Sequence, residues 1–223
     1  MMDARDFKDA VFGQFARMAQ AFAGPKRLEI LDVLAQGERD VETLARETSQ
    51  SVVNASRHLQ VLKNARLVEG RKQGVHVFYR LADPDVVFCW ASLQKLAEKR
   101  SAEVGDIARR YFAERDGLEP ISRQELLKRA NAGEVIVLDV RPSEEYASGH
   151  IRGSLSVPLA ELRQRLNTLG KDREIVAYCR GPYCVLAAEA VVLLRRSGRV
   201  ARRLAEGFPE WRAAGQPIEK GGG

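Results

Sequence analysis

The chain has 223 residues, of which 45% are hydrophobic and 30% charged, and its net charge is +6. This length suffices for two domains of about 100 residues each, and the composition is that of a globular protein, which argues against long disorder. No apolar run approaches the roughly 20 residues that cross a bilayer, and residues 1–6 do not begin a secretory signal, so we expect a cytoplasmic protein that does not bind membranes.

The first 82 residues predict four short helices followed by a hairpin. Turn and capping residues bound these elements: helices over about 7–22, 25–37, 41–47 and 51–65, then strands over 67–71 and 75–81. Gly24-Pro25 separates the first two helices, Asp40 is placed to cap the third, and residues 72–74 form the hairpin tip. This order, with a tight turn at 48–50, predicts an α+β winged helix-turn-helix domain.

Positive charge is concentrated in the fourth helix and the hairpin. Residues 51–80 hold six Lys or Arg against one acid, which favours a surface that faces phosphate, although a solvated basic face is the alternative. Four apolar residues of the fourth helix share one face: Val52, Ala55, Leu59 and Leu62. The outer face and the hairpin carry side chains suited to base edges and phosphates, and we expect DNA contacts from Ser51, Asn54, Ser56, Arg57, His58, Gln60, Arg71 and Lys72.

One long helix is predicted after Asp83-Pro84. Its apolar residues follow a heptad spacing that packs against another helix: Val86, Trp90, Leu93, Ala97, Val104, Ile107 and Tyr111. Core packing within one domain is the alternative to a dimer interface. We favour the interface, and hence a homodimer, because a helix this long extends beyond its small domain.

The motifs of this first segment resemble those of the ArsR-type repressors. The resemblance covers roughly residues 10–110 and rests on three runs: PKRLEIL at 25–31, SRHLQVL at 56–62, and ARLV with GRKQGVHVFYRL over 65–81. It implies a dimeric repressor that binds double-stranded operator DNA.

Two departures from that family change what the domain is expected to sense. Arsenite-sensing members carry a Cys-x-Cys pair where this chain has residues 37–42 without cysteine, and the last helix has acids but no histidine. We therefore expect no metal site. Cys89 stands where persulfide-sensing relatives carry one of two cysteines, but no second thiol is present in the second helix, so we interpret Cys89 as a buried structural residue.

Residues 115–120 are the best linker candidate, which places the boundary between domains 1–115 and 116–223. Beyond it, the unbroken apolar runs 135–138 and 175–178 predict buried parallel strands. Helical stretches separate or follow these strands: 123–131, 159–169 and 183–196. The second domain is therefore expected to be α/β with a central parallel sheet.

Two of the three cysteines lie in one loop between a buried strand and a helix. The loop comprises Cys179, Arg180, Gly181, Pro182, Tyr183 and Cys184. Its position directs backbone N–H groups and the helix dipole at the Cys179 sulfur, which predicts the most thiolate-like cysteine of the chain. Arg180 adds positive charge, Gly181 lets the loop curl around the sulfur, and Cys184 is expected inside the first helical turn. An inert cysteine at a strand end is the alternative.

Four ordered motifs in this domain resemble a single-domain rhodanese over about residues 120–217. They are LDVRP at 138–142, EEYASGHIRGS at 144–154, VPL at 157–159 and EGFPEW at 206–211. The resemblance implies that Cys179 takes sulfur to form a persulfide, that residues 180–184 bind its anion, and that Asp139, Arg141 and His150 brace the fold. Many rhodaneses end this loop with a cationic or hydroxyl residue, whereas Cys184 stands here and offers a resolving thiol. A Cys179–Cys184 disulfide or a bridging polysulfide therefore stays open.

Three functions fit these features. The favoured one is a repressor whose rhodanese-like domain senses a small sulfur or thiol-reactive ligand. The second is a sulfurtransferase or thiol-based oxyanion reductase that represses its own operon, and the third is a DNA-binding protein with an inert rhodanese module. Cys179 in its loop argues against the third. No cofactor is expected, and the identity of the inducer and the operator cannot be read from the sequence.

Overall fold

The computed structural model describes residues 2–113 and 120–222. Its contacts divide the chain into two compact units, Met1–Ala97 and Glu98–Gly223, and each is described by itself. The linker predicted at 115–120, apart from Pro120, and the boundary between residues 115 and 116 lie outside the described residues. None of the helices in the described residues is long and apolar enough to cross a membrane.

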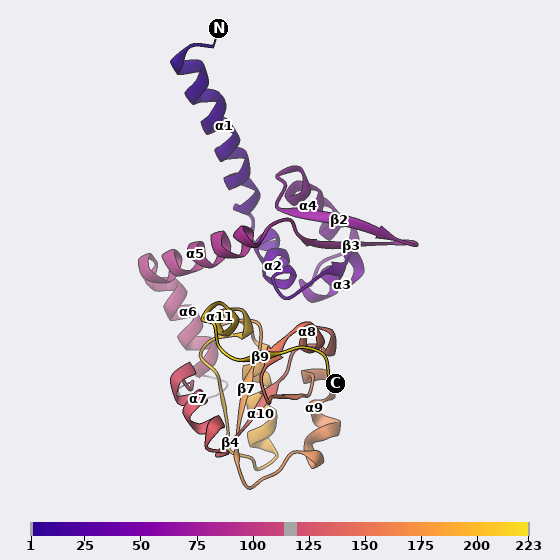
Figure 1. Ribbon diagram of the computed structural model, residues 1–223, viewed down its shortest axis with the longest axis vertical. Coiled ribbons are helices and arrows are strands. Elements are labelled where there is room, and N and C mark those ends of the chain that lie inside the picture. Colours follow the sequence, from indigo (N-terminus) through magenta and orange to yellow (C-terminus); the bar gives the residue numbers. More distant parts are fainter. Residues whose placement is uncertain (1, 114–119, 223) are drawn as a thin grey trace. The chain divides into compact units, whose positions relative to one another are not determined.

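The first unit is a winged helix-turn-helix domain, as predicted (Figure 1). Its elements are α1 (Ala4–Phe22), α2 (Pro25–Leu34), β1 (Arg39–Asp40), α3 (Val41–Glu47), α4 (Val52–Asn64), β2 (Val68–Gln73), β3 (His76–Leu81) and most of α5 (Pro84–Arg100). The strands form an antiparallel sheet in the order β1-β3-β2. Asp40 caps α3 by accepting a hydrogen bond from the Thr43 amide (2.7 Å), as predicted from its residue type.

The hairpin tip lies slightly further along the chain than predicted. Lys72 and Gln73 still pair with β3, opposite Val77 and His76, and the turn is made by Gly74 and Val75. Gly74 has a φ of +61°, a left-handed conformation that glycine adopts without steric cost. We call β2, β3 and this turn the wing.

The core of the first unit lies between α2, α4, the base of the wing and the first half of α5. Fully buried leucines and isoleucine from α2 and α4 form its centre, with Phe22 and Val86 at its edge. Trp90 of α5 packs against this core and donates a hydrogen bond from Nε1 to Asp32 (3.1 Å). The first two positions of the predicted heptad therefore serve the core of their own unit rather than an interface.

Helix α1 contributes only its last residues to that core. Ala21 and Phe22 are buried, whereas four large apolar residues earlier in the helix are exposed: Phe7, Phe12, Phe15 and Met18. Figure 1 shows α1 extending away from the other helices of the first unit. On α5, Phe88, Leu93 and Leu96 are also exposed.

The single long helix predicted after Pro84 is wrong, because the helix breaks at Ser101. α5 ends at Arg100 and α6 (Ala102–Ala113) begins two residues later, with the Ser101 hydroxyl donating to Glu103 (2.6 Å). The break interrupts the heptad seam. The interpretation of Cys89 as a buried residue is also wrong, since its side chain is exposed on α5.

The second unit is an α/β domain around a parallel sheet with the order β6-β4-β7-β8, as predicted (Figure 1). Besides α6, it contains α7 (Arg123–Asn131), β4 (Val135–Asp139), α8 (Ser143–Ser148), β5 (His150–Ile151), β6 (Leu155–Ser156), α9 (Leu159–Arg165), a 3-10 turn (Leu166–Thr168), β7 (Glu174–Tyr178), α10 (Leu186–Arg196), β8 (Ala201–Arg203), α11 (Phe208–Ala213) and β9 (Ile218–Glu219). The short strands β5, β6, β8 and β9 were not among the predicted elements.

Alternation along β4 and β7 sends side chains into two separate cores. Ile136, Leu138, Ile175 and Ala177 pack with residues of α9 and α10 on one face, together with Cys179. The intervening residues, such as Val137 and Tyr178, pack with residues of α7 and α11 on the other face. Burial on both faces explains why these strands are unbroken apolar runs in the sequence.

Candidate functional site

The outer face of α4 is more apolar than the sequence pattern predicted. Ala55, Leu59 and Leu62 are fully buried, whereas Val52 is exposed, so its assignment to the buried face is wrong. Val53 is 61% exposed and lies four residues before Arg57 and seven before Gln60, which places it on the stripe opposite the core. Sequence reasoning missed Val53 because its apolar type indicated the core.

The other residues expected to contact DNA occupy the same region. Asn54, Ser56 and Arg57 are exposed, and His58 is half-buried. The Ser51 hydroxyl caps α4 by accepting a hydrogen bond from the Asn54 amide (3.2 Å). Gln60 donates to Asn64 (2.7 Å), which orients its amide along the helix surface. Among the residues that the structure describes, Arg57 has no ion-pair partner, so its charge is available to a phosphate.

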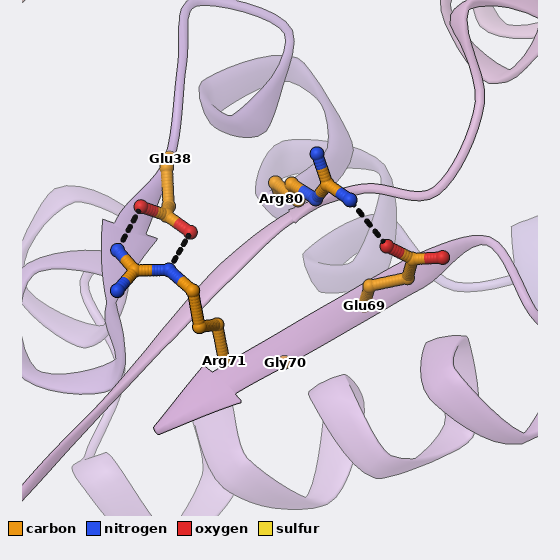
Figure 2. A pocket seen from close by; sticks show the side chains of 5 residues that line it. All are labelled: Glu38, Glu69, Gly70, Arg71 and Arg80. Carbon is orange, nitrogen blue, oxygen red and sulfur yellow. Dashed lines mark hydrogen bonds and ion pairs between the residues drawn. The ribbon is translucent and has the colours of Figure 1, made fainter. Parts of the chain in front are cut away.

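The wing presents its two arginines already paired with carboxylates (Figure 2). Arg71 donates to both oxygens of Glu38, from Nε (3.3 Å) and from Nη2 (2.8 Å), and Arg80 Nη2 lies 2.8 Å from Glu69. The bond to Glu38 raises the pKa of Arg71. Lys72, in contrast, has no ion pair within the described part of the chain. Of the two wing residues predicted to contact DNA, Arg71 is therefore already paired with a carboxylate, whereas the charge of Lys72 is not balanced by any described residue.

In the second unit, β7 delivers Cys179 to the start of a loop that runs to Val185. α10 begins only at Leu186, so the expectation that Cys184 lies in the first helical turn is wrong. The Cys184 amide instead donates to the Gly181 carbonyl (3.1 Å), which closes a turn around Pro182. This turn brings the two thiols together.

Cys179 and Cys184 are both free thiols, and a hydrogen bond from the Cys179 side chain to the Cys184 backbone joins the two residues. The Cys179 side chain is 3% exposed, and its sulfur lies 3.5 Å from the Cys184 carbonyl oxygen. Burial raises the pKa of Cys179, while the hydrogen bond from Cys179 lowers the pKa of Cys184. The directions of these two pKa shifts oppose the prediction that Cys179 is the most thiolate-like cysteine and favour the thiolate at Cys184 instead.

Backbone amides of the loop and of the start of α10 act on the pKa of both cysteines. The amides of Gly181 and Ala187 favour the thiolate of Cys179, and those of Arg180 and Leu186 favour that of Cys184. The Arg180 guanidinium itself pairs with the buried Glu145, with Nη2 2.6 Å from Oε1. The loop therefore offers N–H donors to an anion. Much of the positive charge of Arg180 is balanced by the Glu145 carboxylate.

The glycine that this loop requires is Gly207 rather than Gly181. A Cβ atom on Gly207 would lie 2.2 Å from the Gly181 nitrogen and 2.3 Å from the Arg180 carbonyl carbon, whereas a Cβ on Gly181 would meet nothing closer than 3.7 Å. The next amide, of Phe208, donates to the Cys179 carbonyl (3.0 Å). The 206–211 motif thus packs directly on the cysteine loop. Sequence reasoning missed this contact because it considered only the glycine inside the loop, Gly181.

A buried ion pair lies behind the loop. Arg141 and Asp139 are both fully buried, with Arg141 Nη2 2.6 Å from Asp139 Oδ2 and the Tyr178 hydroxyl donating to the same oxygen (2.5 Å). The guanidinium also donates to the Gly149 carbonyl (2.8 Å) and lies over the Phe208 ring. These contacts join β4, β7 and the 206–211 motif, in agreement with a bracing role.

Tyr183 of the loop forms a further hydrogen bond within the second unit. The Tyr183 hydroxyl donates a hydrogen bond to Glu98 in the last turn of α5 (2.7 Å), both residues belonging to the second unit. Partial desolvation and the hydrogen bond to the Glu98 carboxylate raise the pKa of Tyr183.

Comparison with known proteins matches each unit and the whole chain. The profile of the bacterial regulatory protein, arsR family, matches residues 24–70, and that of the rhodanese-like domain matches residues 122–214. Over 221 residues the chain is 46% identical to the HTH-type transcriptional regulator Rv0324 of Mycobacterium tuberculosis, covering 99% of this chain and 97% of that protein.

Two further matches cover single units. A sulfurtransferase of Allochromatium vinosum is 33% identical over 89 residues, which are 40% of this chain and 82% of that protein. The solution structure of a homodimeric winged helix-turn-helix DNA-binding domain from Mycobacterium bovis is 42% identical and covers 45% of this chain and 94% of that one, with a TM-score of 0.42.

Proposed function

Because the chain belongs to the ArsR family of HTH-type transcriptional regulators and carries a rhodanese-like domain after its winged helix, we propose that it is a repressor whose Cys179 accepts sulfane sulfur and thereby weakens operator binding. The observation that carries this proposal is the contact between the free cysteines Cys179 and Cys184 just before α10, where the Cys179 sulfur lies 3.5 Å from the Cys184 carbonyl oxygen. One of the two thiols can give its proton to the other, and nearby backbone N–H groups favour the thiolate that forms.

The pair supplies the proton transfer that sulfur acceptance needs. With thiosulfate as donor, the Cys184 thiolate takes the Cys179 proton as the Cys179 sulfur bonds to the outer sulfur of the donor. The S–S bond of thiosulfate breaks and sulfite leaves with its electron pair, so Cys179 becomes a persulfide. Once Cys184 has lost its proton again, its thiolate can attack the inner sulfur, forming a Cys179–Cys184 disulfide and releasing hydrosulfide.

We expect Cys179→Ser to bind DNA but to ignore the signal. Thiosulfate or inorganic polysulfide should add sulfur to the wild-type protein at Cys179 and lower its affinity for a duplex selected from a random pool by about 5- to 150-fold. The serine variant should keep its affinity. Mass spectrometry locates the added sulfur, and fluorescence anisotropy measures DNA binding.

Cys184→Ser is the matched control for this experiment. It lacks both the base and the resolving thiol, so the persulfide on Cys179 should form more slowly but, once formed, should persist rather than convert to a disulfide. A Cys179→Ser protein that still releases DNA would assign sensing to another thiol, and the exposed Cys89 would be the first candidate. A persulfidated wild-type protein with unchanged DNA affinity would favour the second candidate function, a sulfurtransferase, which the likeness to the Allochromatium protein supports.

The DNA-binding half of the proposal is tested by Arg57→Ala. Arg57 lies on the outer stripe of α4 without an ion-pair partner in the described chain, so its removal should weaken binding and reduce the slope of log affinity against log salt by about 1. Arg152→Ala, the same change at an exposed site of the second unit, should leave both values unchanged. Equal binding by wild type and Arg57→Ala at every salt concentration would assign the DNA contact to another face.

We also propose that a second copy of the chain covers the apolar faces of α1 and α5. A 19-residue helix with exposed aromatic side chains gains little stability by itself and needs a partner. Leu93→Glu places a charge among these residues and should shift the protein from dimer to monomer in light scattering. Val200→Glu, which changes an exposed valine of the second unit, should leave the mass unchanged. A Leu93→Glu dimer would exclude this face.

A further inference from the structure

Both ion pairs of the wing line the same open cavity (Figure 2). The cavity has a volume of about 650 Å³ and is bounded by Glu38, Glu69, Gly70, Arg71 and Arg80. We call it the wing cavity. Glu69 and Arg80 are direct cross-strand neighbours on β2 and β3, whereas Glu38 reaches Arg71 from the residue before β1. Two guanidinium groups and two carboxylates therefore border one hollow on the surface of the DNA-binding unit.

The Arg71 guanidinium is held in a fixed orientation. Besides its two bonds to Glu38, it donates from Nη1 to Gln73 (3.0 Å), and its Cζ atom lies 5.6 Å from the centre of the Phe78 ring. An arginine held in this way has lost side-chain freedom before any ligand arrives, which lowers the entropy cost of a later contact. Its remaining N–H groups are unoccupied by these partners.

The pairs are nonetheless open to exchange. The side chains of Arg71 and Arg80 are 56% and 65% exposed, and exposed ion pairs contribute little to stability and are screened by salt. Carboxylate and phosphate both match the planar guanidinium, but a DNA phosphate belongs to a densely charged polymer and can therefore compete for the arginine. A duplex that approaches the wing thus competes with both carboxylates.

We propose that the wing cavity is a seat for a DNA backbone phosphate and that Glu38 and Glu69 mask it as built-in counter-ions. The inference rests on the proposed DNA-binding function and adds to it. While the carboxylates stay beside the arginines, a bound phosphate meets almost no net charge there and few counter-ions are released. Removing a carboxylate unmasks one arginine, which then behaves like an ordinary phosphate contact.

Glu38→Gln tests this directly, because glutamine keeps the shape of the side chain and removes its charge. We expect tighter binding to both a selected and a random-sequence duplex, since phosphate contacts carry no sequence information. The salt slope should steepen by about 0.9, so the advantage over the wild-type protein should shrink by about 3.5-fold when salt rises from 50 to 200 mM. Glu69→Gln should act in the same way through Arg80.

Two controls separate unmasking from other effects of lost charge. In Glu38→Gln/Arg71→Ala the gain in affinity and slope should disappear, because no guanidinium is left to unmask. Glu42→Gln removes a carboxylate of the same region that contacts His76 rather than an arginine, and it should leave the slope unchanged. Thermal melting of each variant confirms that the unit is folded.

The outcomes distinguish the inference from the function on which it rests. Weaker or unchanged DNA binding by Glu38→Gln would mean that the Glu38–Arg71 pair only braces the wing. A gain in affinity that persists without Arg71 would mean a general charge effect. Either result would overturn the proposal that Glu38 masks a phosphate site. A wild-type protein that binds neither duplex would instead refute the proposed DNA-binding function.

Discussion

Asp139→Asn is expected to lower the free energy of unfolding of the second unit by about 3–5 kcal/mol, the usual effect of breaking a buried ion pair. The variant keeps the shape of the side chain but leaves the fully buried Arg141 without its nearest negative charge. Glu145, 4.0 Å from that guanidinium, is already engaged by Arg180 and compensates only in part. The loss is a large share of the 5–15 kcal/mol that stabilises an ordinary domain.

Denaturant unfolding of a Trp90→Phe background measures this effect, because the buried Trp211 then reports on the second unit alone. Asp172→Asn makes the same chemical change at an exposed ion pair of that unit and should change stability by less than about 0.5 kcal/mol. Equal midpoints for the two variants would show that the Asp139–Arg141 pair is not what holds β4 to β7.

Gly207→Ala should slow sulfur acceptance by Cys179 by about 100-fold. The new methyl group would occupy the place of the Gly181 and Arg180 backbone, and no side-chain rotation relieves an overlap with backbone atoms. The cysteine loop has to move, and a shift of about 1 Å in reacting groups is enough for a loss of this size. The rate of persulfide formation, followed by mass spectrometry, is the measurement.

Gly13→Ala provides the comparison, since a Cβ at that position of α1 meets no atom within 4 Å. Its rate of persulfide formation should equal that of the wild-type protein. A Gly207→Ala variant with a normal rate would mean that the 206–211 motif is free to move away from the loop, and that the close packing of the two segments is not needed for the reaction.

Local signals in the sequence predicted the elements that local physics determines. Asp40 was recognised as a cap from its type and position, and its side chain does accept the expected amide. The apolar runs 135–138 and 175–178 were recognised as buried parallel strands, and both faces of these strands are indeed covered. In each case the local structural preference of the residues agrees with the fold of the whole domain.

The errors arose where another segment decides the outcome. The heptad spacing continued through Ser101, although serine favours helix starts, and this residue was the available signal for the break. Val53 was missed because its apolar type indicated the core, although its spacing to Arg57 and Gln60 places it on the outer face of α4. The opposite directions of the Cys179 and Cys184 pKa shifts also depend on how closely the loop brings the two residues together, which is set by turn geometry rather than by the motif.

Arg71 illustrates a further limit of reasoning from charge counts. Its basic neighbours made it a candidate phosphate contact, but its ion-pair partner, Glu38, lies 33 residues earlier in the chain. A charge count over the sequence of α4 and the wing does not include that carboxylate. Counting charges along the sequence therefore overestimates how many of them a ligand meets.

The isolated position of α1 also has a thermodynamic consequence. The side chains of Phe7, Phe12 and Phe15 stay largely exposed when a single chain folds, so the free energy of covering them becomes available only when chains associate. If a second copy covers them, the stability of the first unit grows with the logarithm of protein concentration, by mass action. A cell with few copies would then hold this unit closer to its unfolding threshold than a cell with many, and the abundance of the regulator would itself set the strength of repression.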